Sequence, residues 1–443
     1  MNAPLRAELV CSQGCAFAAP VTEVVYQCPA CAGLLEVRHD VAALQARSPQ
    51  EWKELFSARY GEASLPNASG IWGKKEWVLP ELPQEHIVSL GEGHGPLLPL
   101  PRMARELGLS SLELKACGVS PTGSFKDLGM TVLVSAVKWM RARGQRIRAV
   151  ACASTGDTSA AVSAYCAAAG IPSVVFLPRG KVSIAQLLQP ISNGALVLSL
   201  DTDFDGCMRV VREVTANRSI YLANSMNSLR LEGQKIVAAE LCQQRGWQAP
   251  DWVVIPGGNL GNASALAMGF TLLLALGLID RLPRIAVGQA HKANPLYRSF
   301  QTGFLDTSPV HARATLASAI QIGDPVSMKR AIRALKAFDG VVEEASESEL
   351  ANASARADRE GAYCCPQTGV ALAALERLCA KGVVAPQSQV VVISTAHGLK
   401  FSSFKESYHL GRLPEVESVQ ANPPVEVGAT CAEVERVLDR RLA

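Results

Sequence analysis

One lysine of this chain is placed where an amine can take part in covalent chemistry. The segment SPTGSFKDLGMTVLVSAVKWMRARG predicts a helix from about Ser124 to Arg143. Thr122 or Ser124 is available as N-cap, and Gly144 would end the helix. Lys126 then lies in the first turn, where the helix dipole disfavours a cation by up to about 1 kcal/mol but does not disfavour a neutral amine. A neutral lysine is what Schiff-base formation needs. The alternative is a lysine that points into solvent.

A glycine-rich turn, GGNLGN at residues 257–262, follows the apolar run WVVIP and precedes an Ala-rich segment. A strand that leads through glycines into a helix brings free backbone amides and the helix dipole to one point, where a phosphate can bind. The pattern is neither a nucleotide P-loop nor G-x-G-x-x-G. The alternative is a tight turn without a ligand.

A second turn, STGDTS at residues 154–159, also lies between an apolar run and an Ala-rich segment. Its backbone amides and the hydroxyls of Ser154, Thr155 and Thr158 could bind a carboxylate. The alternative is that Asp157 is an ordinary helix N-cap.

The segment VVVISTAHGLKF predicts a buried strand that ends in hydroxyl side chains. Thr395 could hydrogen-bond a heteroaromatic nitrogen. His397 could equally be a structural histidine.

Four cysteines near the N-terminus have metal-ligand spacing. Cys11 and Cys15 form a C-x3-C pair, Cys28 and Cys31 form a C-x2-C pair, and twelve residues separate the two pairs, close to a zinc ribbon. Four thiolates could hold a structural zinc ion, and four free thiols are the alternative. The remaining cysteines lie scattered in apolar segments, so we expect buried thiols of a reducing compartment.

The elements that carry these motifs predict a parallel sheet covered by helices. IRAVACAST, SVVFLP and WVVIP are typical of strands, and TSAAVSAYCAAAG predicts a helix closed by Gly170. Ligands of such sheets bind at the carboxyl ends of the strands, in the turns that lead into helices. We therefore expect the motifs to meet there.

Size and composition favour a multi-domain protein with a small-molecule partner. The chain has 443 residues, of which 48% are hydrophobic, and its 43 basic and 40 acidic residues nearly cancel. This balance argues against nucleic acid or an anionic membrane as a partner. No apolar run is long enough for a membrane span, and the N-terminal residues lack a signal-peptide pattern, so we expect a cytoplasmic protein.

The order of the motifs SPTGSFKD, STGDTS, GGNLGN and STAHG resembles the tryptophan synthase β-like (fold type II) family of pyridoxal phosphate enzymes. Within it, the chain is most similar to the plant-type threonine synthases. Further segments that carry this likeness are GIWGKKEWVLPE, NSMNSLRLEGQK, SAIQIGDPVS and CPQTGVAL. The likeness covers most of the chain.

The resemblance implies conversion of O-phosphohomoserine and water to threonine and phosphate, with pyridoxal 5′-phosphate held by Lys126. It implies that Asp157 lies near the ring hydroxyl of the cofactor and that Thr395 faces its ring nitrogen. Substrate phosphate would bind at Asn224, Ser225 and Arg230; an exposed helix arginine is the alternative for Arg230. The residues implied to hold the cofactor phosphate are Gly258, Asn259, Leu260, Gly261 and Asn262.

These expectations combine into an α/β, two-domain parallel-sheet fold of type II with a zinc-ribbon-like N-terminal extension. We expect the extension at 1–87, with the cysteine motif at about 8–38, and a tail with a helix at 411–443. A large domain would take 88–120 and 222–410, and a small one 121–221. The resemblance also implies a homodimer. A threonine or serine dehydratase, which needs no pocket for substrate phosphate at Ser225 and Arg230, and a catalytically silent ligand-sensing protein are the rival functions.

Overall fold

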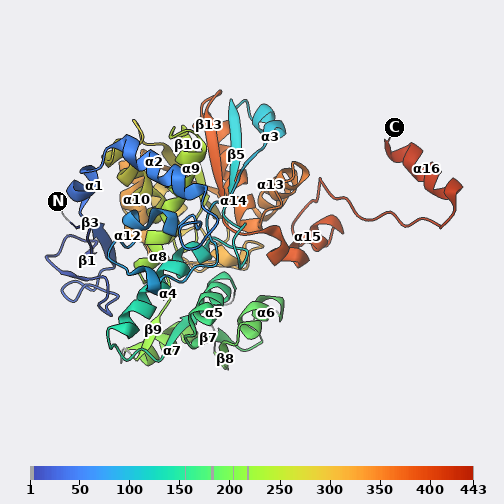
Figure 1. Cartoon of the computed structure of the whole chain (residues 1–443). Coiled ribbons are helices and arrows are strands. Elements are labelled where there is room, and N and C mark those ends of the chain that lie inside the picture. Colours follow the sequence, from blue (N-terminus) through green and yellow to red (C-terminus); the bar gives the residue numbers. More distant parts are fainter. Residues whose placement is uncertain (1–3, 155, 181–183, 203, 217–218, 443) are drawn as a thin grey trace.

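In the described part of the chain the strands form three sheets, and Figure 1 shows how they are arranged in the computed structural model. The structure describes residues 4–154, 156–180, 184–202, 204–216 and 219–442. The fold is α/β, and its two larger sheets are parallel apart from one edge strand. None of the described helices combines the length and the apolar character that crossing a membrane requires.

The largest sheet has six strands in the order β12-β11-β10-β13-β5-β4, and only β4 is antiparallel to its neighbour. Strand β10 shows why the sheet forms here: Val253 packs into the core that contains α10, and Val254 packs into the core that contains α14. A strand buried on both faces is what a helix-covered parallel sheet requires. The strands are β4 (Leu97–Pro99), β5 (Ser111–Ala116), β10 (Trp252–Pro256), β11 (Arg284–Ala290), β12 (Val341–Ala345) and β13 (Gln389–Ser394).

Helices cover both faces of this sheet. Helix α14 packs on its central strands with α13 outside it, while α10 packs with α9 and α12 on the other side. The helices of this region are α3 (Pro101–Glu106), α8 (Leu229–Gln234), α9 (Ile236–Gln244), α10 (Gly261–Ala275), α11 (Pro295–Gln301), α12 (Met328–Ala337), α13 (Glu347–Arg359), α14 (Pro366–Ala380) and α15 (Ser402–His409), with 3-10 turns at Ser318–Ile320 and Gly398–Phe401.

A four-stranded parallel sheet has the order β8-β7-β6-β9. The predicted strands and the predicted helix closed by Gly170, which adopts a left-handed φ of 64°, are present. The elements here are α4 (Lys126–Ala142), β6 (Ala149–Ala153), α5 (Asp157–Ala169), β7 (Ser173–Pro178), α6 (Ile184–Ser192), β8 (Leu196–Leu200), α7 (Phe204–Thr215) and β9 (Ile220–Leu222).

The N-terminal residues form a third, antiparallel sheet, in the order β2-β1-β3. Its strand β3 packs against α8: the carbonyl of Leu35 accepts hydrogen bonds from Ser228 and Arg330. His39 Nε2 lies 2.6 Å from a carboxylate oxygen of the buried Glu232. The elements are β1 (Ala7–Cys11), β2 (Ala18–Pro20), β3 (Leu35–His39), α1 (Val41–Gln45) and α2 (Pro49–Tyr60), with 3-10 turns at Trp72–Trp77 and Gln84–His86.

The two ends of the chain differ in how they pack. While the N-terminal sheet joins the main core, helix α16 (Cys431–Leu442) has no buried residue and stands apart from the body at the end of an extended segment (Figure 1).

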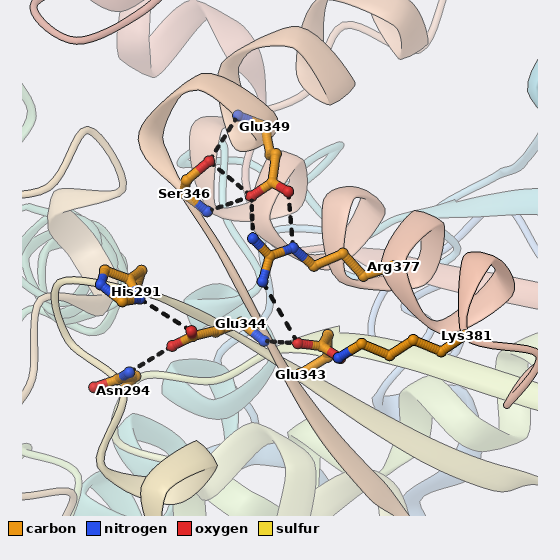
Figure 2. Close-up of polar contacts among 8 residues, drawn as sticks. All are labelled: His291, Asn294, Glu343, Glu344, Ser346, Glu349, Arg377 and Lys381. Atoms are coloured by element: carbon orange, nitrogen blue, oxygen red, sulfur yellow. Dashed lines mark hydrogen bonds and ion pairs between the residues drawn. The ribbon is translucent and has the colours of Figure 1, made fainter.

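A polar network fixes the edge strand β12 to α13 and α14 (Figure 2). Glu343 meets Arg377 and Lys381, and Arg377 also makes two 2.8 Å hydrogen bonds to Glu349 of α13. The side chain of Glu344 accepts hydrogen bonds from His291 and Asn294 on the other side of the strand. Each of the three glutamates in this network therefore has a partner.

Candidate active site

A cavity of about 1290 Å³ lies where strands of both parallel sheets end. It brings together thirteen of the fourteen residues predicted to contact cofactor or substrate: Lys126, Ser154, Asp157, Thr158, Asn224, Ser225, Arg230, Gly258, Asn259, Leu260, Gly261, Asn262 and Thr395. Thr155 lies outside the described residues. Motifs as far apart in the sequence as Lys126 and Thr395 thus face one space.

Lys126 is the first residue of α4, so it lies in the first turn as predicted. Burial, the larger cause, and the positive charge of Arg230 together lower the pKa of its amine to about 7, and the charge of Asp157 opposes them. Lys126 Nζ lies 4.2 Å from the ring centroid of Phe125 and forms no ion pair with any described residue. The site therefore favours the neutral amine.

The start of α4 differs from the prediction. The helix begins at Lys126 rather than Ser124, and neither Thr122 nor Ser124 is its N-cap. Thr122 instead donates its hydroxyl and its backbone N–H to the carboxylate of Asp127, at 2.6 and 2.7 Å. Asp127, in the first turn, competes with the helix N–H groups for Thr122. A prediction from N-cap residue types alone does not take this carboxylate into account.

The loop before Lys126 is fixed against the end of β13. The N–H of Phe125 donates to the carbonyl of Thr395 at 2.8 Å, and the N–H of His397 donates to the carbonyl of Gly123 at 2.9 Å. His397 Nδ1 also accepts from the N–H of Leu399, which favours the structural interpretation of this histidine. These backbone contacts hold Lys126 and Thr395 at one end of the cavity.

The start of α5 faces the same space. Ser154 Oγ accepts from the N–H groups of Gly156 and Ser159. Asp157 is the first helical residue and makes no capping hydrogen bond, so the interpretation of Asp157 as an N-cap is wrong. Its carboxylate lies 3.3 Å from Lys400 Nζ instead.

Arg230 lies in α8 and is 3% exposed, so the alternative of an exposed helix arginine is wrong. Its Nη1 donates to the carbonyl of Ala223 at 3.1 Å, and its buried Nε has no partner among the described residues. Burial lowers the pKa of this guanidinium to about 10, although the nearby Cys152 opposes the shift. A buried cation without a counter-charge in a cavity indicates a site for an anion.

The glycine-rich turn fits a phosphate group. Leu260 turns the chain with a φ of 64°, and α10 begins at Gly261 without a side-chain cap. A Cβ on Gly258 would lie only 3.0 Å from Ile320. The backbone is therefore close to its neighbours, and the uncapped start of a long helix faces the cavity, as an amide cradle for an anion requires.

The three predicted asparagines are bound to the backbone. Asn224 exchanges two hydrogen bonds with Ala153 at the end of β6, at 2.9 and 3.0 Å. Asn262 Nδ2 donates to the last carbonyl of β10, and Asn259 Oδ1 accepts from the N–H of Val326. These side chains fix the walls of the cavity.

Two further residues on the cavity wall were missed in the sequence. Lys400 Nζ donates to the carbonyl of Thr122 at 2.8 Å and to Gln189 of α6 at 2.9 Å, besides its contact with Asp157. Gln367 lies at the start of α14 with both polar side-chain atoms unpaired. Both lie in segments that carry the family likeness, HGLK and CPQTG, but no physical pattern singled them out.

The model of the family described as pyridoxal-phosphate dependent enzyme matches residues 88–396. The chain belongs to this family. It is 54% identical over 422 residues to threonine synthase 2, chloroplastic, of Arabidopsis thaliana, which covers 95% of this chain and 82% of the relative. It is also 38% identical over 381 residues to the threonine synthase of Methanocaldococcus jannaschii, covering 86% and 90%.

A solved structure of similar fold is the threonine synthase of Escherichia coli, with a TM-score of 0.65, 20% identity, and coverage of 98% of this chain and 99% of that one. At this identity the likeness concerns the fold. The two sequence relatives place the chain among the threonine synthases, within the pyridoxal-phosphate dependent enzymes.

Proposed function

We propose that this protein converts O-phosphohomoserine and water to threonine and phosphate. The observation that carries the proposal is the 54% identity to a threonine synthase over 95% of the chain. The cavity supports it, because the half-buried amine of Lys126 and the buried guanidinium of Arg230 face a space that also contains an uncapped helix start for a phosphate.

The overall reaction defines what the residues must do. The bond between the γ carbon and its phosphate-bearing oxygen breaks, and the oxygen of water bonds to the β carbon. One proton leaves the β carbon and one leaves water; one ends on the γ carbon and the other on phosphate. The site must therefore bind a dianion, admit water and move protons.

When bound, the cofactor supplies an electron sink for the carbanions that these proton transfers create. Lys126 would hold the cofactor covalently and then move protons at the substrate carbons, a role that suits an amine whose pKa is lowered to about 7 by burial. The turn at 258–262 would hold the cofactor phosphate through backbone amides. Asp157, placed by Lys400, would lie near the ring hydroxyl, and Thr395 would face the ring nitrogen.

Arg230 would bind the substrate phosphate with Ser225, while Asn224 positions the adjoining strand end. The start of α5, with Ser154, Thr155 and Thr158, would bind the substrate carboxylate through its amides and hydroxyls. A guanidinium that lies buried before the substrate arrives needs little reorganisation to bind a dianion.

The direct test supplies O-phosphohomoserine to the cofactor-loaded protein and measures phosphate and threonine. We expect equal amounts of the two products. Efficient deamination of serine or threonine, without phosphate release from O-phosphohomoserine, would replace this proposal with a dehydratase.

We further propose one structural zinc ion at Cys11, Cys15, Cys28 and Cys31, whose sulfur atoms all lie within 4.8 Å of one another. Because β3 of the same sheet packs against α8, the metal would stabilise the module that supports Arg230. Elemental analysis of protein purified without chelator should find about one zinc per chain. A ratio near zero, with Cys28→Ser as stable as the parent, would favour four free thiols.

The remaining expectations stay proposals. The two parallel sheets support a large domain at 88–120 and 222–410 and a small domain at 121–221. A homodimer in the cytoplasm is the proposed state, and sedimentation and cell fractionation test these two points. One relative is chloroplastic by name, and a plastid location of this protein would overturn the proposal of a cytoplasmic location.

A further inference from the structure

One polar side chain in the cavity wall lacks any partner in the protein. Gln367 is the second residue of α14, a 15-residue helix, and is only 2% exposed. Among the described residues, neither its Nε2 nor its Oε1 has a hydrogen-bond partner, and the residue lines the cavity. Proteins rarely bury an amide unpaired, so this amide calls for a ligand.

The neighbours of Gln367 are already engaged with one another. Cys365 Sγ lies 3.1 Å from Thr368 Oγ1, and Thr368 Oγ1 lies 3.1 Å from Ser394 Oγ. This chain of contacts runs on to Thr395, 3.7 Å from Cys365 Sγ. The start of α14 is therefore fixed next to Thr395, and Gln367 is the residue of this turn whose polar end remains free for a ligand.

The hydrogen-bonding groups of an amide limit which ligand groups Gln367 can bind. A neutral carboxamide offers one acceptor and two donor hydrogens, which suits a hydroxyl or a water molecule that also both donates and accepts. The charged groups of the proposed reaction have other partners: Arg230 for the substrate phosphate, the start of α5 for the carboxylate, and the start of α10 for the cofactor phosphate. The oxygen that water delivers to the β carbon has none.

We propose that Gln367 binds this oxygen, first as the water that enters and then as the hydroxyl of threonine. The inference rests on the proposed function, because it needs a reaction in which water becomes a hydroxyl. It makes Gln367 a determinant of affinity for β-hydroxy amino acids and of water position during the reaction.

The test compares two ligands that differ by one hydroxyl. Binding of L-threonine and of L-2-aminobutyrate to the cofactor-loaded protein is measured from the change in visible absorbance. The parent should bind threonine more tightly than 2-aminobutyrate. Gln367→Leu should lower the affinity for threonine about three- to ten-fold, the range for one neutral hydrogen bond, and leave the affinity for 2-aminobutyrate unchanged. Gln234→Leu, a change of the same kind on another wall of the cavity, should leave the ratio of the two affinities unchanged.

A second readout uses the cofactor-free protein. Because leucine removes an unpaired buried amide, Gln367→Leu should unfold at the same temperature as the parent or a higher one. Gln367→Met provides the same test should leucine prevent folding. Equal weakening of both ligands, or no change in either, would overturn the proposal.

The two proposals can fail separately. If the protein releases no phosphate from O-phosphohomoserine, yet prefers threonine through Gln367, the proposed reaction fails and the hydroxyl subsite stands. If phosphate is released but the preference for threonine is the same in Gln367→Leu, the subsite fails and the proposed reaction stands.

Discussion

The network around β12 and the wall of the cavity use the same residue types in opposite ways. Around β12, Glu343 and Glu349 share Arg377, so each charge has a partner (Figure 2). In the cavity, Lys126 and Arg230 form no ion pair with any described residue. Burial lowers the pKa of both cavity groups, to about 7 and about 10, whereas the carboxylate of Glu349 raises the pKa of Arg377.

The paired charges around β12 therefore stabilise the fold, whereas the unpaired charges of the cavity are available to bind a ligand. A desolvated cation without a partner lowers the free energy of unfolding. Such a cation is expected where an anionic or carbonyl group of a ligand binds to it. Substitutions in the cavity should therefore reduce activity and preserve stability, whereas substitutions around β12 should do the reverse.

The largest effect is expected for Lys126→Ala. Turnover should fall by at least about 10⁴-fold, because Lys400, another lysine that lines the cavity, is already bound to Asp157, Thr122 and Gln189. The folded protein should be at least as stable as the parent, since alanine removes a desolvated amine. Phosphate release and thermal unfolding of the cofactor-free proteins measure the two effects. Residual turnover within tenfold of the parent would contradict the assignment.

Arg230→Ala should cost about 2 to 5 kcal/mol of transition-state binding, a loss of roughly thirty-fold to several-thousand-fold in kcat/KM. The visible absorbance should remain, because the cofactor phosphate binds at a different turn. Arg230→Lys should restore activity only in part, since an ammonium cannot make two parallel hydrogen bonds. An Arg230→Ala enzyme with parental kcat/KM would remove the phosphate subsite from this place.

A pH-dependent difference in stability should accompany Lys126. Its pKa is about 7 in the folded protein and near the ordinary lysine value when unfolded, so unfolding takes up a proton between these values. The stability of the cofactor-free parent should therefore rise with pH across this window relative to Lys126→Ala. The gain from Lys126→Ala should be largest below pH 7 and should fade toward about pH 10. A gain independent of pH would show that the amine is solvated.

Asp157→Asn should have a smaller effect. Because Asp157 contacts Lys400 and does not cap α5, the substitution should leave α5 intact and retain most activity, while it shifts the pH dependence of the visible absorbance. An unchanged titration would mean that the carboxylate does not act on the cofactor.

The smallest effect on activity is expected for Arg377→Ala, the matched control for Arg230→Ala. Arg377 is partly exposed, so losing its pairs with Glu343 and Glu349 should lower stability by about 0.5 to 1 kcal/mol. Its kcat/KM should stay within about twofold of the parent, because Arg377 does not line the cavity and distant sites act independently of one another. A large loss of activity would erase the distinction between the two regions.

Sequence patterns predicted the central strands well, because continuous apolar runs such as WVVIP leave few alternatives. Strands β7 and β10 begin and end at the predicted residues. The predicted start of α4 was wrong by two residues, because Asp127 competes for the hydroxyl of Thr122 and this competition depends on the folded loop.

The motifs predicted which turns meet, but not how each side chain is used. That Asn224 is bound to Ala153 and that Asp157 contacts Lys400 depends on segments brought together only by the fold. Gln367 illustrates the same limit, since an unpaired amide is defined by what surrounds it and a sequence does not contain that information.

We infer that Lys126 is the amine that remains free to bind the cofactor. Borohydride reduction of the cofactor-loaded protein, followed by peptide mapping, tests it most directly. We expect one pyridoxyl group per chain, on the peptide that contains Lys126. A pyridoxyl group on any other lysine, such as Lys400, would contradict it.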